Sequence, residues 1–194
     1  MSLEAPPIGW IHKKISRDEK GWIIACAIVC IAMFFWMVLW HVYGKQNPSS
    51  TTYSTTPAEF SLLTKNFTEQ NKIGEDNGIP VVYPKPGSDI FLMGEMWRWS
   101  SVVVLKKDEW YTFHLSSKDV VHGFSVQPIN MNFMVFPNYD YVMKFKPNKA
   151  GDYMVVCNEF CGIGHHLMIG KIVVIEDESE LTKLGYNLKT SNNG

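Results

Sequence analysis

Residues 101–129, "SVVVLKKDEWYTFHLSSKDVVHGFSVQPI", hold three short runs rich in valine and aromatic residues. The polar stretches "KKDE" and "SSKD" separate these runs. Short runs of β-branched and aromatic residues bounded by turn-forming residues are typical of β-strands. No long helical pattern interrupts them, which argues against alternating strands and helices. The stretch therefore predicts consecutive strands of an all-β domain.

The same pattern continues in both directions along the chain. "VVYP" and "DIFLMGEMWRW" precede this stretch, and "NFMVFP", "YVMKFKP", "GDYMVVC" and "IGKIVVIE" follow it. Turn signals such as "KPGSD", "PNYD" and "PNKAGD" lie between the runs. About seven to nine short strands at this spacing predict a mainly β sandwich or Greek-key barrel over residues 81–176.

Residues 22–43, "WIIACAIVCIAMFFWMVLWHVY", contain no Asp, Glu, Lys or Arg. At about 1.5 Å per residue, a helix of this length crosses a hydrocarbon core of about 30 Å. We predict a single-pass anchor in the lipids of the cell membrane. Basic residues before the span outnumber those just after it, so residues 1–21 are expected in the cytoplasm and the rest on the extracytoplasmic side.

The other segments are expected to be peripheral. Residues 44–80 are predicted to be a linker, Ser/Thr-rich at first, with a short helix from Ala58 that places Phe60, Leu63 and Phe67 on one face. Residues 177–194 are predicted to be a polar tail. The net charge of −1, with no run of basic residues, argues against a nucleic-acid-binding protein.

Near the C-terminus, Cys157–Met168 reads "CNEFCGIGHHLM", which gathers two thiols, imidazoles and a thioether. On an oxidising side of the membrane, Cys157 and Cys161 are candidates for a disulfide. Zinc would use cysteine and histidine, but a thioether favours copper. A blue-copper site would leave one cysteine over and needs a second, distant histidine. His122, at the end of "SSKDVVHGF", is available for that position.

The stretch matches C-x-E-x-C-G-x-x-H-x-x-M and resembles the copper A segment of cytochrome c oxidase subunit II. "DVVHGF" and "MWRW" resemble two further segments of that family. The resemblance implies a cupredoxin-like Greek-key fold after one transmembrane helix. It also implies a binuclear copper A centre held by two bridging cysteines, two histidines, a weak thioether ligand and a weak backbone carbonyl ligand: Cys157, Cys161, His122, His165, Met168 and Glu159.

The resemblance further implies that this chain is where electrons enter a haem-copper terminal oxidase, an oxidoreductase and translocase. The donor would be a soluble cytochrome c or a small copper protein. Electrons would pass to haem in subunit I, where dioxygen becomes water and protons are pumped, so this chain carries no catalytic residue itself. The single span resembles the B-type (ba-type) branch. Alternatives are the copper A subunit of a nitric oxide reductase and, from another class, a membrane-tethered copper carrier.

Three residues outside the ligand set are candidates for further roles. Trp97 matches an exposed aromatic that receives electrons from the donor in the similar family. Strand alternation would place Trp99 on the same sheet face, so Trp99 is the second candidate for electron entry. Glu19, just before the span, matches an acidic residue near the cytoplasmic mouth of the proton-uptake path.

Overall fold

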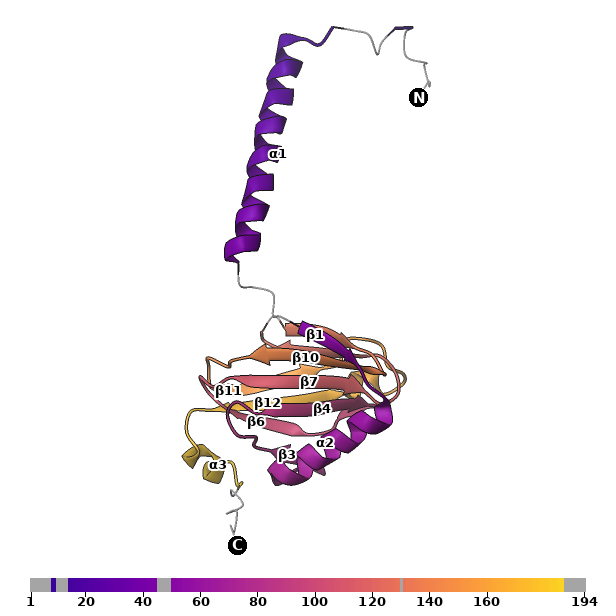
Figure 1. Ribbon diagram of the computed structural model, residues 1–194, viewed down its shortest axis with the longest axis vertical. Helices are drawn as coiled ribbons and strands as arrows, with labels where there is room; N and C mark the ends of the chain where they lie inside the picture. The colour runs from indigo at the N-terminus through magenta and orange to yellow at the C-terminus, as the bar shows by residue number, and fades with distance from the viewer. Residues whose placement is uncertain (1–7, 10–13, 45–49, 130, 187–194) are drawn as a thin grey trace. The chain divides into compact units, whose positions relative to one another are not determined.

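The computed structural model describes residues 8–9, 14–44, 50–129 and 131–186, and the chain divides into two compact units. The first unit ends at Asn47 and contains helix α1 (Arg17–Tyr43). The second begins at Pro48 and contains all the described strands, with helices α2 (Pro57–Asn71) and α3 (Ser179–Lys183). Figure 1 shows the elements within each unit.

Helix α1 is apolar along its length, as the composition of residues 22–43 predicts. It has 27 residues, and none of them is buried by the rest of the described chain. It is long and apolar enough to cross a membrane. A capping box starts the helix, in which Ser16 Oγ accepts from Glu19 N and the Glu19 carboxylate accepts from Ser16 N. These contacts fix where the helix begins.

The second unit is a sandwich of two mixed β-sheets. The five-stranded sheet has the order β1 (Ser50–Ser54), β10 (Tyr139–Phe145), β7 (Tyr111–Ser117), β4 (Asp89–Glu95), β5 (Arg98–Trp99). The seven-stranded sheet has the order β2 (Lys72–Asp76), β3 (Ile79–Val82), β6 (Val102–Lys106), β12 (Ile169–Ile175), β11 (Gly151–Val156), β8 (His122–Gln127), β9 (Met131–Val135). The pairs β4–β7, β3–β6 and β6–β12 are parallel. The expected mainly β sandwich is confirmed.

The main core lies between the two sheets. Leu92 and Phe113 from the five-stranded sheet meet Val103 and Phe124 from the other. Strand β6 reads "VVVLK" without polar alternation because both of its faces are buried. Its other face belongs to a second cluster that includes Leu181 of α3. Strands buried on both faces lose the alternating pattern, and this is usual where pairing is parallel.

Helix α2 covers the outer face of the five-stranded sheet. Thr56 caps its first turn, and Pro57 stands at the start, where its missing N–H costs nothing. The rings of Phe60 and Phe67 lie 5.9 and 6.2 Å from the ring of Phe91 on β4. Leu63 was expected on this face but is exposed, since the buried stripe runs through positions 60, 64 and 67.

The β unit extends beyond the predicted span of 81–176. The stretch expected to be a linker contributes β1, α2, β2 and the start of β3 to the sandwich. Its strands, "STTYS" and "KIGED", hold only one apolar or aromatic residue each, Tyr53 and Ile73, whereas the strand prediction depended on runs of such residues. Both are edge strands, where one side faces solvent and polar residues are tolerated. The described part of the chain accordingly has twelve strands instead of about seven to nine.

Replacing Phe60 by alanine is expected to destabilise the β unit by about 3 to 5 kcal/mol, because a fully buried ring leaves a cavity. Denaturant unfolding followed by tryptophan fluorescence measures this loss. Leu63→Ala, at an exposed position of the same helix, is the control. Equal losses in the two variants would contradict the packing of α2 described above.

Candidate metal centre

The residues of the candidate metal centre come from two places that the seven-stranded sheet brings together. His122 begins β8, and Cys157 follows the end of β11. These strands pair antiparallel, with Val156 opposite Ser125, so the start of one lies beside the end of the other. The loop from Cys157 to Met168 then returns to β12 through a short 3-10 turn at His165–Leu167. This register explains why residues 35 positions apart in the chain meet.

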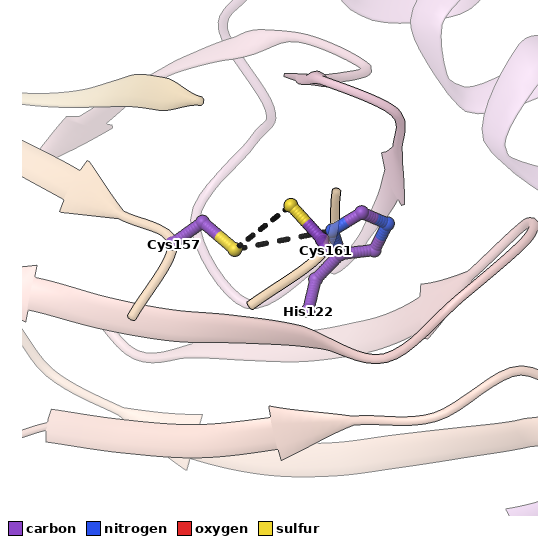
Figure 2. A group of neighbouring side chains, drawn as sticks. All are labelled: His122, Cys157 and Cys161. Atoms are coloured by element: carbon purple, nitrogen blue, oxygen red, sulfur yellow. Dashed lines mark hydrogen bonds between the residues drawn. The ribbon is translucent and has the colours of Figure 1, made fainter. Parts of the chain in front are cut away.

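The two cysteine sulfurs face each other inside the domain. Cys157 Sγ lies 3.7 Å from Cys161 Sγ, and both residues are buried. A disulfide bond is about 2.05 Å long, so these thiols are not joined. Figure 2 shows the two sulfurs pointing toward one another, with the His122 imidazole beside them. One ligand atom from each of these three residues lies within 4.8 Å of the others.

The other predicted ligands surround this pair. His122 Nδ1 lies 3.9 Å from Cys157 Sγ, and His165 Nδ1 lies 3.6 Å from Cys161 Sγ. Met168 Sδ is 3.9 Å from Cys161 Sγ, and the Cys157 thiol donates to the Glu159 carbonyl oxygen at 3.2 Å. Each sulfur therefore has one imidazole and one weaker donor beside it.

This arrangement has the spacing and chemistry of a metal site. A metal–thiolate bond is about 2.3 Å long, so sulfurs 3.7 Å apart can bind the same ion. Thiolate and thioether sulfurs together are ligands that favour copper over zinc. The donor set fits copper.

The His122 ring is fixed by contacts on its other side. Its Nε2 is 2.8 Å from Asp119 Oδ1, and the imidazole is fully buried. The buried Trp99 ring meets it edge-on, with ring centroids 6.4 Å apart. A carboxylate behind a ligating histidine holds the proton on Nε2 and leaves Nδ1 free for a metal.

The protonation of the site follows from its burial and hydrogen bonds. Burial alone would raise the pKa of Asp119, but hydrogen bonds from Met96 N, His122 and Val120 N outweigh it and hold the pKa below its usual value. Burial, with the hydrogen bond to Cys157, raises the pKa of the Cys161 thiol to about 11. Without metal this thiol stays protonated at neutral pH, so metal binding must release a proton.

The loop approaches the backbone of Gly123 closely. A Cβ added there would overlap Asn158 Oδ1 and lie 2.7 Å from Asn158 N. The Gly123 N–H donates to Cys157 Sγ at 3.4 Å. A glycine after His122 thus lets the loop bring its first cysteine over the start of β8.

Trp97 and Trp99 do not share a sheet face, so this prediction is wrong. In the β4–β5 hairpin Glu95 pairs with Arg98, which leaves Met96 and Trp97 as the two turn residues. A tight turn breaks the alternation on which the prediction depended. Trp99 is buried in the core, whereas Trp97 is 40% exposed and lies against the metal-site loop. Its Nε1 donates to the Cys161 carbonyl at 3.1 Å.

Exposed apolar side chains next to the metal ligands form a surface that we call the apolar rim, and apart from Trp97 its members were not predicted from the sequence. It consists of exposed side chains from the Trp97 hairpin and the metal-site loop: Met96, Trp97, Phe160, Ile163 and Leu167. Phe160, Ile163 and Leu167 stand between the ligands in "CNEFCGIGHHLM". When the ligands of a short loop point inward, the residues between them must point outward. Apolar residues at such positions are the signal that could have predicted this rim.

Glu19, the predicted proton-uptake residue, lies in α1, in the other unit of the chain. Within the described residues, the one hydrogen bond found for its side chain is the capping-box bond that it accepts from Ser16 N.

A family model matches the part of the chain that holds these features. The model, described as cytochrome c oxidase subunit II, periplasmic domain, matches residues 90–177. This range contains the predicted metal ligands and both tryptophans of the β4–β5 hairpin.

Three individual proteins are similar. Cytochrome c oxidase subunit 2 of Thermus thermophilus is 27% identical over 171 residues, which is 85% of this chain and 96% of that protein. Heme-copper oxidase subunit 2 of Aeropyrum pernix is 35% identical over 78 residues, 39% of this chain and 33% of that one. A chain of a heme-copper terminal oxidase dimer solved by cryo-EM aligns with a TM-score of 0.55 and 25% identity, covering 82% of this chain and 100% of that one.

Proposed function

Because the chain belongs to the cytochrome c oxidase subunit II family, we propose that it is the subunit through which electrons enter a haem-copper terminal oxidase. A soluble cytochrome c or a small copper protein is the donor. Haem in subunit I is the acceptor, and dioxygen reduction coupled to proton pumping takes place there. The cluster of two thiols, two imidazoles and a thioether, with neighbouring donors 3.6–3.9 Å apart, carries this proposal.

The cofactor is proposed to be binuclear copper A, which supplies a one-electron redox couple when bound. Cys157 and Cys161 would bridge both ions. His122 and His165 would each bind one ion. Met168 and the carbonyl oxygen of Glu159 would be the two weak ligands. The pairing of one imidazole and one weak donor with each sulfur supports two ions instead of one.

The protein contributes a rigid and dry environment. Cys157, Cys161, His122 and Met168 are each at most 3% exposed, and strands β8 and β11 hold the two ends of the site in register. Buried donors that paired strands hold in register need little rearrangement when the charge of the site changes. This burial also favours a permanent redox centre over a carrier that releases its copper.

The apolar rim is proposed to be where the donor docks. Trp97 is a natural electron-receiving group, because its indole is exposed on one side and hydrogen-bonded to the backbone of a ligand residue on the other. Tryptophan side chains are enriched at the energetic centre of protein interfaces, and Trp97 lies in this rim.

Helix α1 is proposed to anchor the subunit in the cell membrane, with the N-terminus in the cytoplasm and the copper domain outside. The charge bias around the helix supports this orientation. Proton uptake at Glu19 stays a prediction that rests on the family resemblance alone.

The proposal is tested by copper analysis of the full chain in detergent. We expect two copper ions per chain and a seven-line hyperfine pattern in electron paramagnetic resonance, because one unpaired electron is shared by two copper nuclei. A haem-bearing subunit that reduces dioxygen should co-purify. One ion with a four-line pattern, or copper lost to a mild chelator, would refute the copper A assignment. A partner that reduces nitric oxide instead would refute the oxidase assignment.

Met168→Leu is expected to keep most of the copper but to shift the reduction potential, since a weak thioether ligand tunes a copper site more than it holds the metal. Leucine fills the same buried space as methionine. A redox titration followed by optical absorption measures the shift. An unchanged potential would show that Met168 is a packing residue only.

A further inference from the structure

The Asp119 carboxylate contacts two separate parts of the domain. Its Oδ1 lies 2.8 Å from His122 Nε2 and accepts from Val120 N at 2.7 Å. Its Oδ2 accepts from Met96 N, in the β4–β5 turn, at 2.8 Å. Met96 and Asp119 are 23 positions apart in the chain. One half-buried side chain therefore connects a proposed metal ligand with the turn that carries Trp97.

The same turn has a second connection to the metal centre. The Trp97 indole donates to the Cys161 carbonyl, and a Cβ added at Gly164 would overlap the Trp97 ring. The turn is thus held at its first residue by the carboxylate behind His122 and at its second by the backbone of Cys161. Each contact leads to a different ligand of the centre.

We propose that Asp119 is a positioning residue that couples the orientation of the His122 imidazole to the placement of the Trp97 turn. This inference rests on the proposed function, in which His122 binds copper and Trp97 receives electrons. When metal fixes the imidazole, the carboxylate is fixed with it, and so is the turn. The electron-receiving residue is then in place when the centre is assembled.

The chemistry of the side chain supports this role. An ionised carboxylate accepts hydrogen bonds at both oxygens, whereas an amide has one acceptor oxygen and one donor nitrogen. An asparagine side chain at this position could not serve both Met96 N and His122 Nε2–H. Other contacts still hold the β4–β5 hairpin. The Lys118 side chain forms an ion pair with Glu95, and the Lys118 backbone N–H donates to the Gly94 carbonyl. Asp119→Asn is therefore expected to loosen the turn without unfolding the domain.

The chain offers a matched control. Asp140 on β10 also holds an imidazole, with its Oδ2 2.7 Å from His114 Nδ1, and its side chain is 14% exposed against 25% for Asp119. This pair lies in the five-stranded sheet. Asp140→Asn removes the same charge from the same kind of pair without touching the Trp97 turn.

The test is hydrogen exchange at the Met96 amide in the full chain in detergent, copper-free and copper-loaded. In the wild type we expect slow exchange that copper slows further. In Asp119→Asn we expect exchange about tenfold faster or more, since a hydrogen bond to a charged acceptor is lost, and no response to copper. Asp140→Asn should behave as the wild type. The copper spectrum of Asp119→Asn should also change, because a neutral amide supports the His122 ring less strongly than a carboxylate does.

Met96 exchange in Asp119→Asn equal to the wild type would overturn the proposal. The proposal would also be overturned if Asp140→Asn accelerated Met96 exchange as much as Asp119→Asn does. If Asp119→Asn fails to fold, the wild type alone decides. Met96 exchange that does not respond to copper would overturn the proposal, and exchange that copper slows would support it. Failure of the proposed function looks different. The wild type then lacks the shared-electron spectrum, while the copper-free exchange difference between wild type and Asp119→Asn persists.

Discussion

Replacing either Cys157 or Cys161 by serine is expected to abolish the two-copper centre. The sulfurs are 3.7 Å apart, and every other proposed ligand lies within 3.9 Å of one of them. A serine hydroxyl is a hard donor that stays protonated at neutral pH, so it cannot replace a bridging thiolate. Each variant therefore loses the bridge between the ions as well as a ligand.

Copper content and electron paramagnetic resonance of the purified full chain measure this loss. We expect at most one copper ion and no seven-line pattern in either variant. Cys26→Ser is the control, because Cys26 is an exposed thiol of α1 and should leave the spectrum unchanged. Two retained copper ions with an intact spectrum in Cys157→Ser or Cys161→Ser would contradict the bridging role.

Trp97→Ala is expected to slow reduction of the copper centre by a soluble cytochrome c about 30-fold at limiting donor, as for the loss of an aromatic anchor worth about 2 kcal/mol. The variant removes both the exposed ring and the hydrogen bond to the Cys161 carbonyl. Stopped-flow absorption of the reduced donor measures the rate.

Two comparisons make this result specific. Trp110→Ala removes an equally large exposed ring, one that lies just before β7, and should leave the rate unchanged. A small inorganic reductant should reduce the Trp97 variant at close to the wild-type rate, because it needs no docking surface. A wild-type rate with cytochrome c would remove Trp97 from the electron route.

Much of the fold could be predicted from periodicity. Strands with a strong apolar pattern, such as the one containing Phe113 and Leu115, were recognised because alternation reflects burial on one face. The polar edge strands β1 and β2 were not predicted, because their pairing depends on backbone hydrogen bonds with neighbouring strands and not on apolar side chains. The orientation of Trp97 relative to Trp99 was predicted wrongly for a related reason. Whether "EMWR" forms a hairpin turn or continues as a strand depends on which residues pair, and here Glu95 pairs with Arg98.

The ligand cluster could be predicted because its members are chemically distinctive and, apart from His122, adjacent in sequence. The roles of their neighbours could not. Asp119 stands three residues before His122, but nothing in the sequence places its second oxygen on Met96 N. The outward direction of Phe160 and Ile163 likewise depends on how the loop folds over Gly123. Such contacts arise only from tertiary packing.

The cover that α2 forms over β4 sets the smallest autonomous folding unit. The family similarity begins at residue 90, inside β4, but Phe91 packs against Phe60 and Phe67. A truncation starting there would strip this cover and remove β1, β2 and β3, leaving β6 and β10 as new sheet edges. Uncovered apolar surface and unpaired edges promote aggregation. A soluble form of the domain should therefore start before Ser50 and retain Leu181. The segment that is similar to the family, residues 90–177, is thus shorter than the segment that can fold on its own.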